Sequence, residues 1–193
     1  MMKKLLSTTL LALCSTTAIA QECSADIAKT ASNTRYYAHD NGTVTDMLTG
    51  LTWMRCQVGK TWNASSNKCT GTAERYFWQS ALTMIESVND VDGNHKLHQF
   101  AGIERWRMPN IKELVSLKEV ACYAPALSSK AFGDTFNFEQ GDYKAYLWSN
   151  TSAGDGSSVM VFDTINAEVY QHNAAKHDFS VLLVAEPNSN VEP

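Results

Sequence analysis

The chain has 193 residues, with 16 Lys and Arg against 20 Asp and Glu, a formal net charge of −4, and 44% hydrophobic residues. Charged residues make up 19%, below the roughly 25% that is typical of soluble domains. This composition excludes a disordered chain, a collagen-like repeat, a coiled coil and a polytopic membrane protein, because apolar residues are plentiful but form no long run.

Residues 1–20, MMKKLLSTTLLALCSTTAIA, have the pattern of a secretory signal peptide. Lys3 and Lys4 form a positive start, residues 5–13 an apolar stretch, and Ala18 and Ala20 a small-x-small cleavage site. The apolar stretch is shorter than the ~20 residues of a membrane span. We therefore expect cleavage near Ala20, a periplasmic or secreted protein, and one domain over 21–193 with a core at about 35–185.

Loss of this leader changes the charge and the cysteine count. Without its two lysines, 14 basic residues face 20 acidic ones, a net charge of −6, which disfavours nucleic acid as a partner. Four cysteines remain, an even number that suits disulfides in an oxidising compartment. Three pairings exist; the short polar segment between Cys56 and Cys69 closes easily, which would join Cys23 to Cys122. A metal site is disfavoured, since no C-x-x-C spacing occurs.

In chain order, the first predicted elements are two short strands, Thr43–Asp46 and Leu51–Arg55, joined by a turn at 47–50. A helix is predicted over Tyr76–Asn89, where apolar residues recur at 77, 81, 85 and 88 with helical spacing. The first part of the chain therefore predicts a hairpin followed by an amphipathic helix.

A second helix is predicted to begin after Pro109. Asn110 can cap the free backbone amides, and Glu113, three residues later, completes a capping box. The inward-facing residues of this helix are expected to be Ile111, Leu114, Leu117 and Ala121.

The last third of the chain is rich in β-branched and aromatic residues. It predicts strands at 146–150, 158–164, 167–171 and 180–185, with a hairpin turn at 163–166. Strands, then two helices, then more strands indicate an α+β fold with mostly antiparallel short strands.

Four segments in this order resemble one bacterial family: Gly42–Cys56, Val58–Ala73, Trp106–Leu117 and Leu147–Thr151. The pieces TVTD…TGLTW, WRMPNIKEL and WSNT resemble the C-terminal domain family of bacterial collagen-like adhesins, over roughly residues 35–184. The resemblance implies a C-type-lectin-like fold, similar to that of formylglycine-generating enzymes. Such a domain is loop-rich and disulfide-tied, with two helices and terminal strands that pair.

The resemblance also implies an exported recognition or adhesion module that binds a glycan or a surface or pilus protein. The founding adhesin is implied to bind sulphated glycosaminoglycans, but this chain lacks a collagen-like stalk and reads VLLV at 181–184 where the family has VR-x-VR. Sulphated polymers are therefore not carried over as ligands. No familiar catalytic motif occurs, so we expect no enzyme activity; the alternatives are a periplasmic or secreted enzyme derived from this fold and a purely structural accessory protein.

Six residues are candidate ligand contacts. Four aromatic side chains can stack on sugar rings or a protein partner, Arg107 can bind an anionic group, and one asparagine can face a loop site. The alternative for each aromatic residue is packing in the core, and the alternative for the arginine is a structural role at the start of the second predicted helix. The candidates are Trp62, Arg107, Tyr143, Tyr146, Asn150 and Tyr170.

Calcium is the one cofactor that the sequence offers. Asp90, Asp92 and Asn94 place oxygen side chains at alternating positions, as in the start of a calcium loop. Gly93 comes two positions early, and Ala101 stands where such a loop has a glutamate. A polar turn after the first helix is the alternative.

Overall fold

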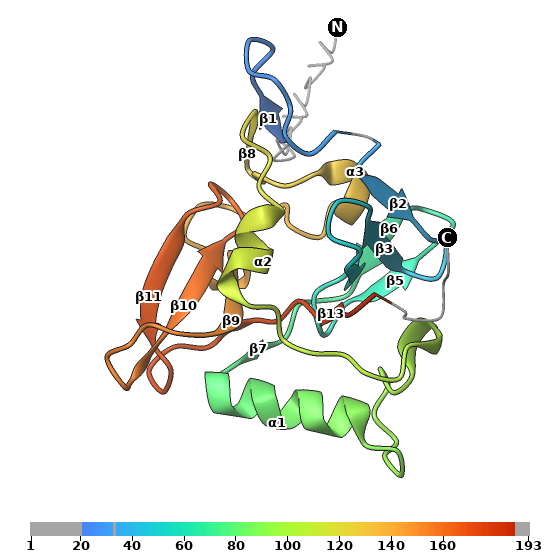
Figure 1. Ribbon diagram of the computed structural model, residues 1–193, viewed down its shortest axis with the longest axis vertical. Coiled ribbons are helices and arrows are strands. Elements are labelled where there is room, and N and C mark those ends of the chain that lie inside the picture. Colours follow the sequence, from blue (N-terminus) through green and yellow to red (C-terminus); the bar gives the residue numbers. More distant parts are fainter. Residues whose placement is uncertain (1–20, 33, 188–193) are drawn as a thin grey trace, which may run out of the picture.

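The computed structural model describes residues 21–32 and 34–187 (Figure 1). The predicted signal peptide lies outside these residues. The described chain is a mixed α+β structure with mostly antiparallel short strands, as predicted, although a lectin-like arrangement does not follow from these elements alone.

The larger sheet has five strands in the order β11-β10-β9-β12-β7. Only the β12–β9 pairing is parallel. The strands are β7 (Arg75–Tyr76), β9 (Tyr146–Ser152), β10 (Ser158–Asp163), β11 (Val169–Asn173) and β12 (Phe179–Ser180). The predicted turn joins β10 to β11, because the Asp163 carboxylate accepts from the Ile165 amide at 2.8 Å and the Asp163 carbonyl from the Ala167 amide at 2.9 Å.

The second sheet has four strands in the order β13-β4-β3-β2. They are β2 (Tyr36–Ala38), β3 (Thr43–Asp46), β4 (Thr52–Met54) and β13 (Val184–Ala185). The predicted β3–β4 hairpin is confirmed. Two small ribbons complete the strands: β1 (Glu22–Cys23) with β8 (Cys122–Tyr123), and β5 (Thr61–Asn63) with β6 (Lys68–Thr70).

Each ribbon carries a disulfide. Cys56 is bonded to Cys69 at the β5–β6 ribbon, and Cys23 is bonded to Cys122 across β1 and β8. Of the three possible pairings, this is the one in which Cys56 and Cys69 close the short polar segment between them. The longer bridge joins residues 99 positions apart and fastens the described N-terminal segment to the chain after α2.

The described residues form three α-helices, one more than predicted: α1 (Trp78–Asn89), α2 (Ile111–Ser116) and the short α3 (Ser129–Phe132). Two 3-10 turns, η1 (Phe100–Gly102) and η2 (Tyr143–Ala145), add to them. The capping box at the start of α2 is confirmed: the Asn110 side chain accepts from the Glu113 amide at 2.9 Å, and Glu113 accepts from the Asn110 amide at 2.7 Å. Figure 1 shows α2 beside β9 and β10, and α1 next to β7, on the side of β7 that faces away from β9.

Residues 179–185 connect the two sheets. Phe179 begins β12 in the larger sheet, and the chain then passes through buried residues 181–183 into β13 of the second sheet. Alternate side chains enter two buried clusters. Leu182 and Val184 pack with α2 and α3, whereas Val181, Leu183 and Ala185 pack with α1.

Several predictions about these elements were wrong. The single strand at 180–185 is two short strands in different sheets, because the segment changes partners. Phe77 is 50% exposed, because it precedes α1 with an extended backbone and so does not lie on the inner helix face. By contrast, the expected pairing of terminal strands is found within the resembling segment, because its last strand, β13, pairs with β4 in the sheet of its first strands, whereas β1, which precedes that segment, pairs with β8.

Candidate functional site

Three of the six candidate ligand residues lie together. Tyr143 from η2, Tyr146 from β9 and Tyr170 from β11 gather with two histidines over one part of the larger sheet. We call this set the tyrosine–histidine cluster; it comprises Tyr143, Tyr146, Tyr170, His172, His177 and Phe179.

The rings of this cluster form a continuous series of contacts. Tyr146 is central, with its ring centroid 6.3 Å from that of Tyr143 and 6.2 Å from that of Tyr170. Phe179 is buried beneath them at 5.3 Å from Tyr146 and contacts the core residue Trp148 at 4.9 Å. Because Phe179 fixes the base, the outer rings are held in place while Tyr143 and Tyr170 remain 46% and 38% exposed.

Two histidines give the cluster hydrogen-bonding capacity. The ring centroids of His172 and His177 are 5.0 Å apart, and the His177 ring stacks parallel to Phe179. Partial burial, together with the charge that His177 can carry, lowers the pKa of His172 below its ordinary value. A neutral imidazole both donates and accepts a hydrogen bond, as a sugar hydroxyl does.

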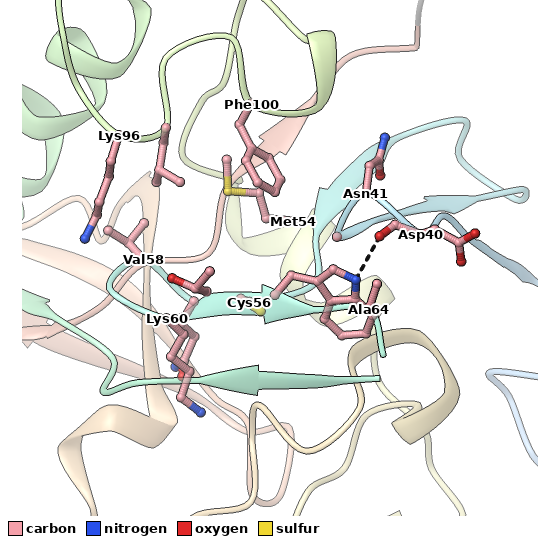
Figure 2. Close-up of a pocket in the computed structure, with 14 residues that line it drawn as sticks. Asp40, Asn41, Met54, Cys56, Val58, Lys60, Ala64, Lys96 and Phe100 are labelled. Atoms are coloured by element: carbon pink, nitrogen blue, oxygen red, sulfur yellow. Dashed lines mark hydrogen bonds between the residues drawn. The ribbon is translucent and has the colours of Figure 1, made fainter. Parts of the chain in front are cut away.

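Trp62 lies elsewhere, in a hollow of about 500 Å³ between the β5–β6 ribbon and η1. This volume falls within the ~300–1,000 Å³ of small-molecule sites. Figure 2 shows Phe100 and Met54 next to each other over β5, with Lys96 towards one end of the hollow and Asn41 towards the other. We call this cavity the Trp62 hollow.

A tight backbone approach shapes the Trp62 hollow. Gly42 has a φ of +87°, and a Cβ there would lie 2.8 Å from the Trp62 Cβ and 3.1 Å from the Phe100 ring. Phe100 itself stands between Gln99 and Ala101, two non-glycine residues with positive φ of 47° and 58°. Because such backbone is costly for these residues, the surrounding packing must hold Phe100 in this position.

The Trp62 indole is fixed on two sides. Its Nε1 donates to the Asp40 carbonyl at 3.1 Å (dashed in Figure 2). The buried Arg55 guanidinium lies 3.8 Å from the centre of the ring, a cation–π contact. Arg55 is in turn held by the Ala131 carbonyl, which accepts from its Nε at 2.7 Å. The hollow is therefore preformed and can take the apolar part of a ligand.

The other two candidate ligand residues lie apart from these sites. The Arg107 guanidinium is engaged by two carboxylates: Glu113 accepts from both terminal nitrogens at 2.8 and 2.7 Å, and Glu186 accepts from Nε at 2.7 Å. We therefore assign Arg107 a structural role at the start of α2 rather than a role in ligand binding. Asn150 is exposed on β9, four residues from Tyr146, or about 13 Å along the strand.

The segment with the calcium-like spacing forms a turn after α1. The Asp90 carboxylate accepts from the Asp92 amide at 3.1 Å, and the Asp90 carbonyl from the Gly93 amide at 3.0 Å. Within residues 21–32 and 34–187, no three His, Cys, Asp or Glu side chains gather as a metal site would require. Calcium binding by Asp90, Asp92 and Asn94 stays a prediction.

Sequence reasoning missed His172, His177 and Phe179 of the cluster, and Gly42 and Phe100 of the hollow. The predicted strand 167–171 contains Tyr170 but stops before His172, whereas β11 extends to Asn173. Had the strand been predicted to its full length, the spacing of two would have placed both side chains on one sheet face. His177 and Phe179 reach the cluster only because β12 inserts beside β9, and no local pattern predicts that.

The two disulfides among the described residues suggest an oxidising, extracytoplasmic location. No described helix has the length and apolar character needed to cross a membrane. The model of one family, the Lcl C-terminal domain, matches residues 42–185, about three quarters of the chain. The chain therefore belongs to the Lcl C-terminal domain family. The curated proteins include no match to it.

Proposed function

We propose that this domain is a non-catalytic recognition module that binds a glycan at the tyrosine–histidine cluster. The observation that carries the proposal is the convergence of Tyr143 and Tyr146, from η2 and the start of β9, with Tyr170 of β11 around His172 and His177. Family membership and the disulfides, which suggest an extracellular domain, support a role outside the cytoplasm.

The dimensions of the cluster suit an oligosaccharide. Since Tyr146 lies 6.3 Å from Tyr143 and 6.2 Å from Tyr170, the outer two centroids are at most 12.5 Å apart, a span that a short glycan covers. The exposed rings offer apolar faces to the C–H groups of sugars. Around them, His172 and Glu168 offer partners for hydroxyl groups, and Glu168 already accepts from the Tyr170 hydroxyl.

The wider setting of this proposal follows the family resemblance. We propose a C-type-lectin-like domain, periplasmic or secreted, that serves a surface adhesin or pilus system. A protein ligand at the same aromatic cluster is the closest alternative, because exposed tyrosines also anchor protein interfaces. An extracytoplasmic enzyme and a purely structural accessory protein are the remaining alternatives.

Glycan-array screening followed by titration calorimetry tests the proposal. The variants Tyr143→Ala and Tyr170→Ala each remove an exposed ring, and we expect each to weaken binding roughly three- to tenfold, as for the loss of about 0.5–1.5 kcal/mol. Tyr37→Ala is the matched control, because Tyr37 is 62% exposed and lies outside the cluster. Unchanged affinity in both cluster variants, or no glycan bound above background, would contradict glycan recognition at this site.

A further inference from the structure

The free edge of strand β11 has none of the usual protection against pairing. β11 ends the larger sheet, and Figure 1 shows it at the outer margin of the molecule. Its five residues, VYQHN, contain no charge and no proline, and they pair with β10 in unbroken register without a bulge. Natural edge strands normally carry charged residues, proline or bulges that prevent pairing with another strand, so an edge without them indicates a pairing partner.

The backbone groups at this edge belong to alternate residues. The Asp163 amide donates to the Glu168 carbonyl at 2.9 Å, and the Ala174 amide to the Ser157 carbonyl at 3.0 Å, so the even-numbered residues of β11 bond to β10. The amides and carbonyls of Val169 and Gln171 therefore point away from the sheet. Neither residue has a backbone hydrogen bond at that edge among the described residues.

We propose that the domain forms a two-fold dimer in which β11 pairs antiparallel with β11 of a second copy. With Gln171 opposite Gln171 on the two-fold axis, Val169 of each copy faces Asn173 of the other, so the outward backbone groups meet. The Asn173 carbonyl already accepts from the Lys176 amide at 3.3 Å, and its second lone pair serves the pairing. Such isologous pairing is the commonest oligomeric arrangement, and it continues one sheet through both copies.

The same register is favoured by the side chains. Tyr170 and His172 are equidistant from Gln171, so each tyrosine lies opposite the histidine of the other copy, and aromatic cross-strand pairs stabilise sheets. The strand itself carries no charge to repel its copy, and Glu168 of one copy approaches the turn that bears Lys176 of the other. A β11–β11 pair would therefore join two tyrosine–histidine clusters into one continuous aromatic face.

Sedimentation velocity over a wide concentration range, without glycan, tests the dimer. Val169→Lys/Asn173→Lys places lysine opposite lysine twice, so we expect its dimer dissociation constant to rise at least tenfold. Val169→Lys/Asn173→Glu is the matched control, because it places lysine opposite glutamate and should retain the dimer. Gln171→Pro removes an outward amide and the side-chain bond from Gln171 Nε2 to Asp155 at 2.9 Å, but no backbone bond between β11 and β10, so it should give a folded monomer.

Each outcome decides the proposal. A wild-type chain that is monomeric at the highest concentration, or a dimer equally stable in both double variants, would overturn it. Circular dichroism of each variant verifies the fold. Dimerisation does not depend on the glycan, whereas the joined aromatic face rests on the proposed function. Dimers without glycan binding would therefore count against the proposed function alone.

Discussion

Glu119 is a buried carboxylate whose hydrogen bonds organise the N-terminal segment. It is 2% exposed, and it accepts from the backbone amides of Thr30, Ala31 and Ala121 at 3.0, 2.8 and 3.1 Å. Burial alone would raise the pKa of this carboxyl, but these amide bonds and the charge of Lys29 lower it overall. A single side chain thus fixes residues 30–31 against the chain that follows α2.

Glu119→Gln should destabilise the domain by roughly 1–3 kcal/mol at neutral pH, because an amide group replaces one accepting oxygen and leaves a buried donor unpaired. A carboxyl with a lowered pKa contributes its stability above its unfolded pKa of about 4.5 and loses it as the pH falls. The deficit should therefore shrink in acid. Urea unfolding at about pH 7 and about pH 3 measures both effects, with the exposed Glu86→Gln as control; a deficit independent of pH would contradict the ionic role.

His172 should make the stability depend on pH as well, in a higher range than Glu119. Its pKa lies below the ordinary value because of burial and the neighbouring His177, so the unfolded chain takes up a proton first as the pH falls. Stability is then complete above about pH 6.5 and declines below it. We expect His172→Asn to reduce the fall in unfolding free energy between about pH 7.5 and about pH 5. If wild type and variant lose the same amount, the cluster does not hold His172 neutral.

At the scale of elements, the β5–β6 ribbon depends on its disulfide. Each of its strands has three residues, and its side chains are mostly exposed, so little apolar burial supports it. The Cys56–Cys69 bond closes a loop with a sequence separation of 13, which in the loop-entropy account stabilises by about 3 kcal/mol. Trp62 and one wall of the hollow therefore rely on this bond.

Cys56→Ser/Cys69→Ser should lower the unfolding free energy by about 3 kcal/mol and accelerate amide hydrogen exchange over residues 61–70. Cys23→Ser/Cys122→Ser is the matched control. It opens a larger loop, with an expected loss of about 5 kcal/mol in unfolding free energy. In this variant, residues 61–70 should exchange no faster than the whole domain unfolds, because their own disulfide is intact. Unchanged exchange over 61–70 in the first variant would show that packing alone holds Trp62.

Elements with local signals were predictable, and those defined by distant partners were not. The α2 capping box and the β3–β4 and β10–β11 hairpins depend on neighbouring residues, so sequence patterns indicated them. By contrast, β5 and β6 lie in a polar segment that reads as a loop, and β7, β12 and β13 are two-residue strands that exist only through pairing. The same division applies to the candidate site. The sequence indicated each tyrosine individually as a ligand contact, but their proximity depends on the order of the strands in the sheet, which no local pattern predicts.

At the scale of the whole molecule, the question is whether the two buried clusters unfold together. Residues 179–185 supply side chains to both, and their backbone also bonds to three other segments: the Met54 amide donates to Leu183, the Val58 amide to Val181, and Arg107 exchanges two bonds with Val184. This buried segment couples the sheets physically. The single domain expected from the sequence therefore predicts one cooperative transition.

Leu182→Ala and Leu183→Ala test this coupling as a matched pair, because adjacent and fully buried leucines enter different clusters. Each should cost about 2–5 kcal/mol through lost burial and the cavity left behind. If the domain is one unit, either variant lowers the exchange protection of α1 and of α3 by the same free energy, and the denaturant m value is unchanged. If Leu183→Ala weakens only α1 while Leu182→Ala weakens only α3, the chain contains two separately unfolding units joined by residues 179–185.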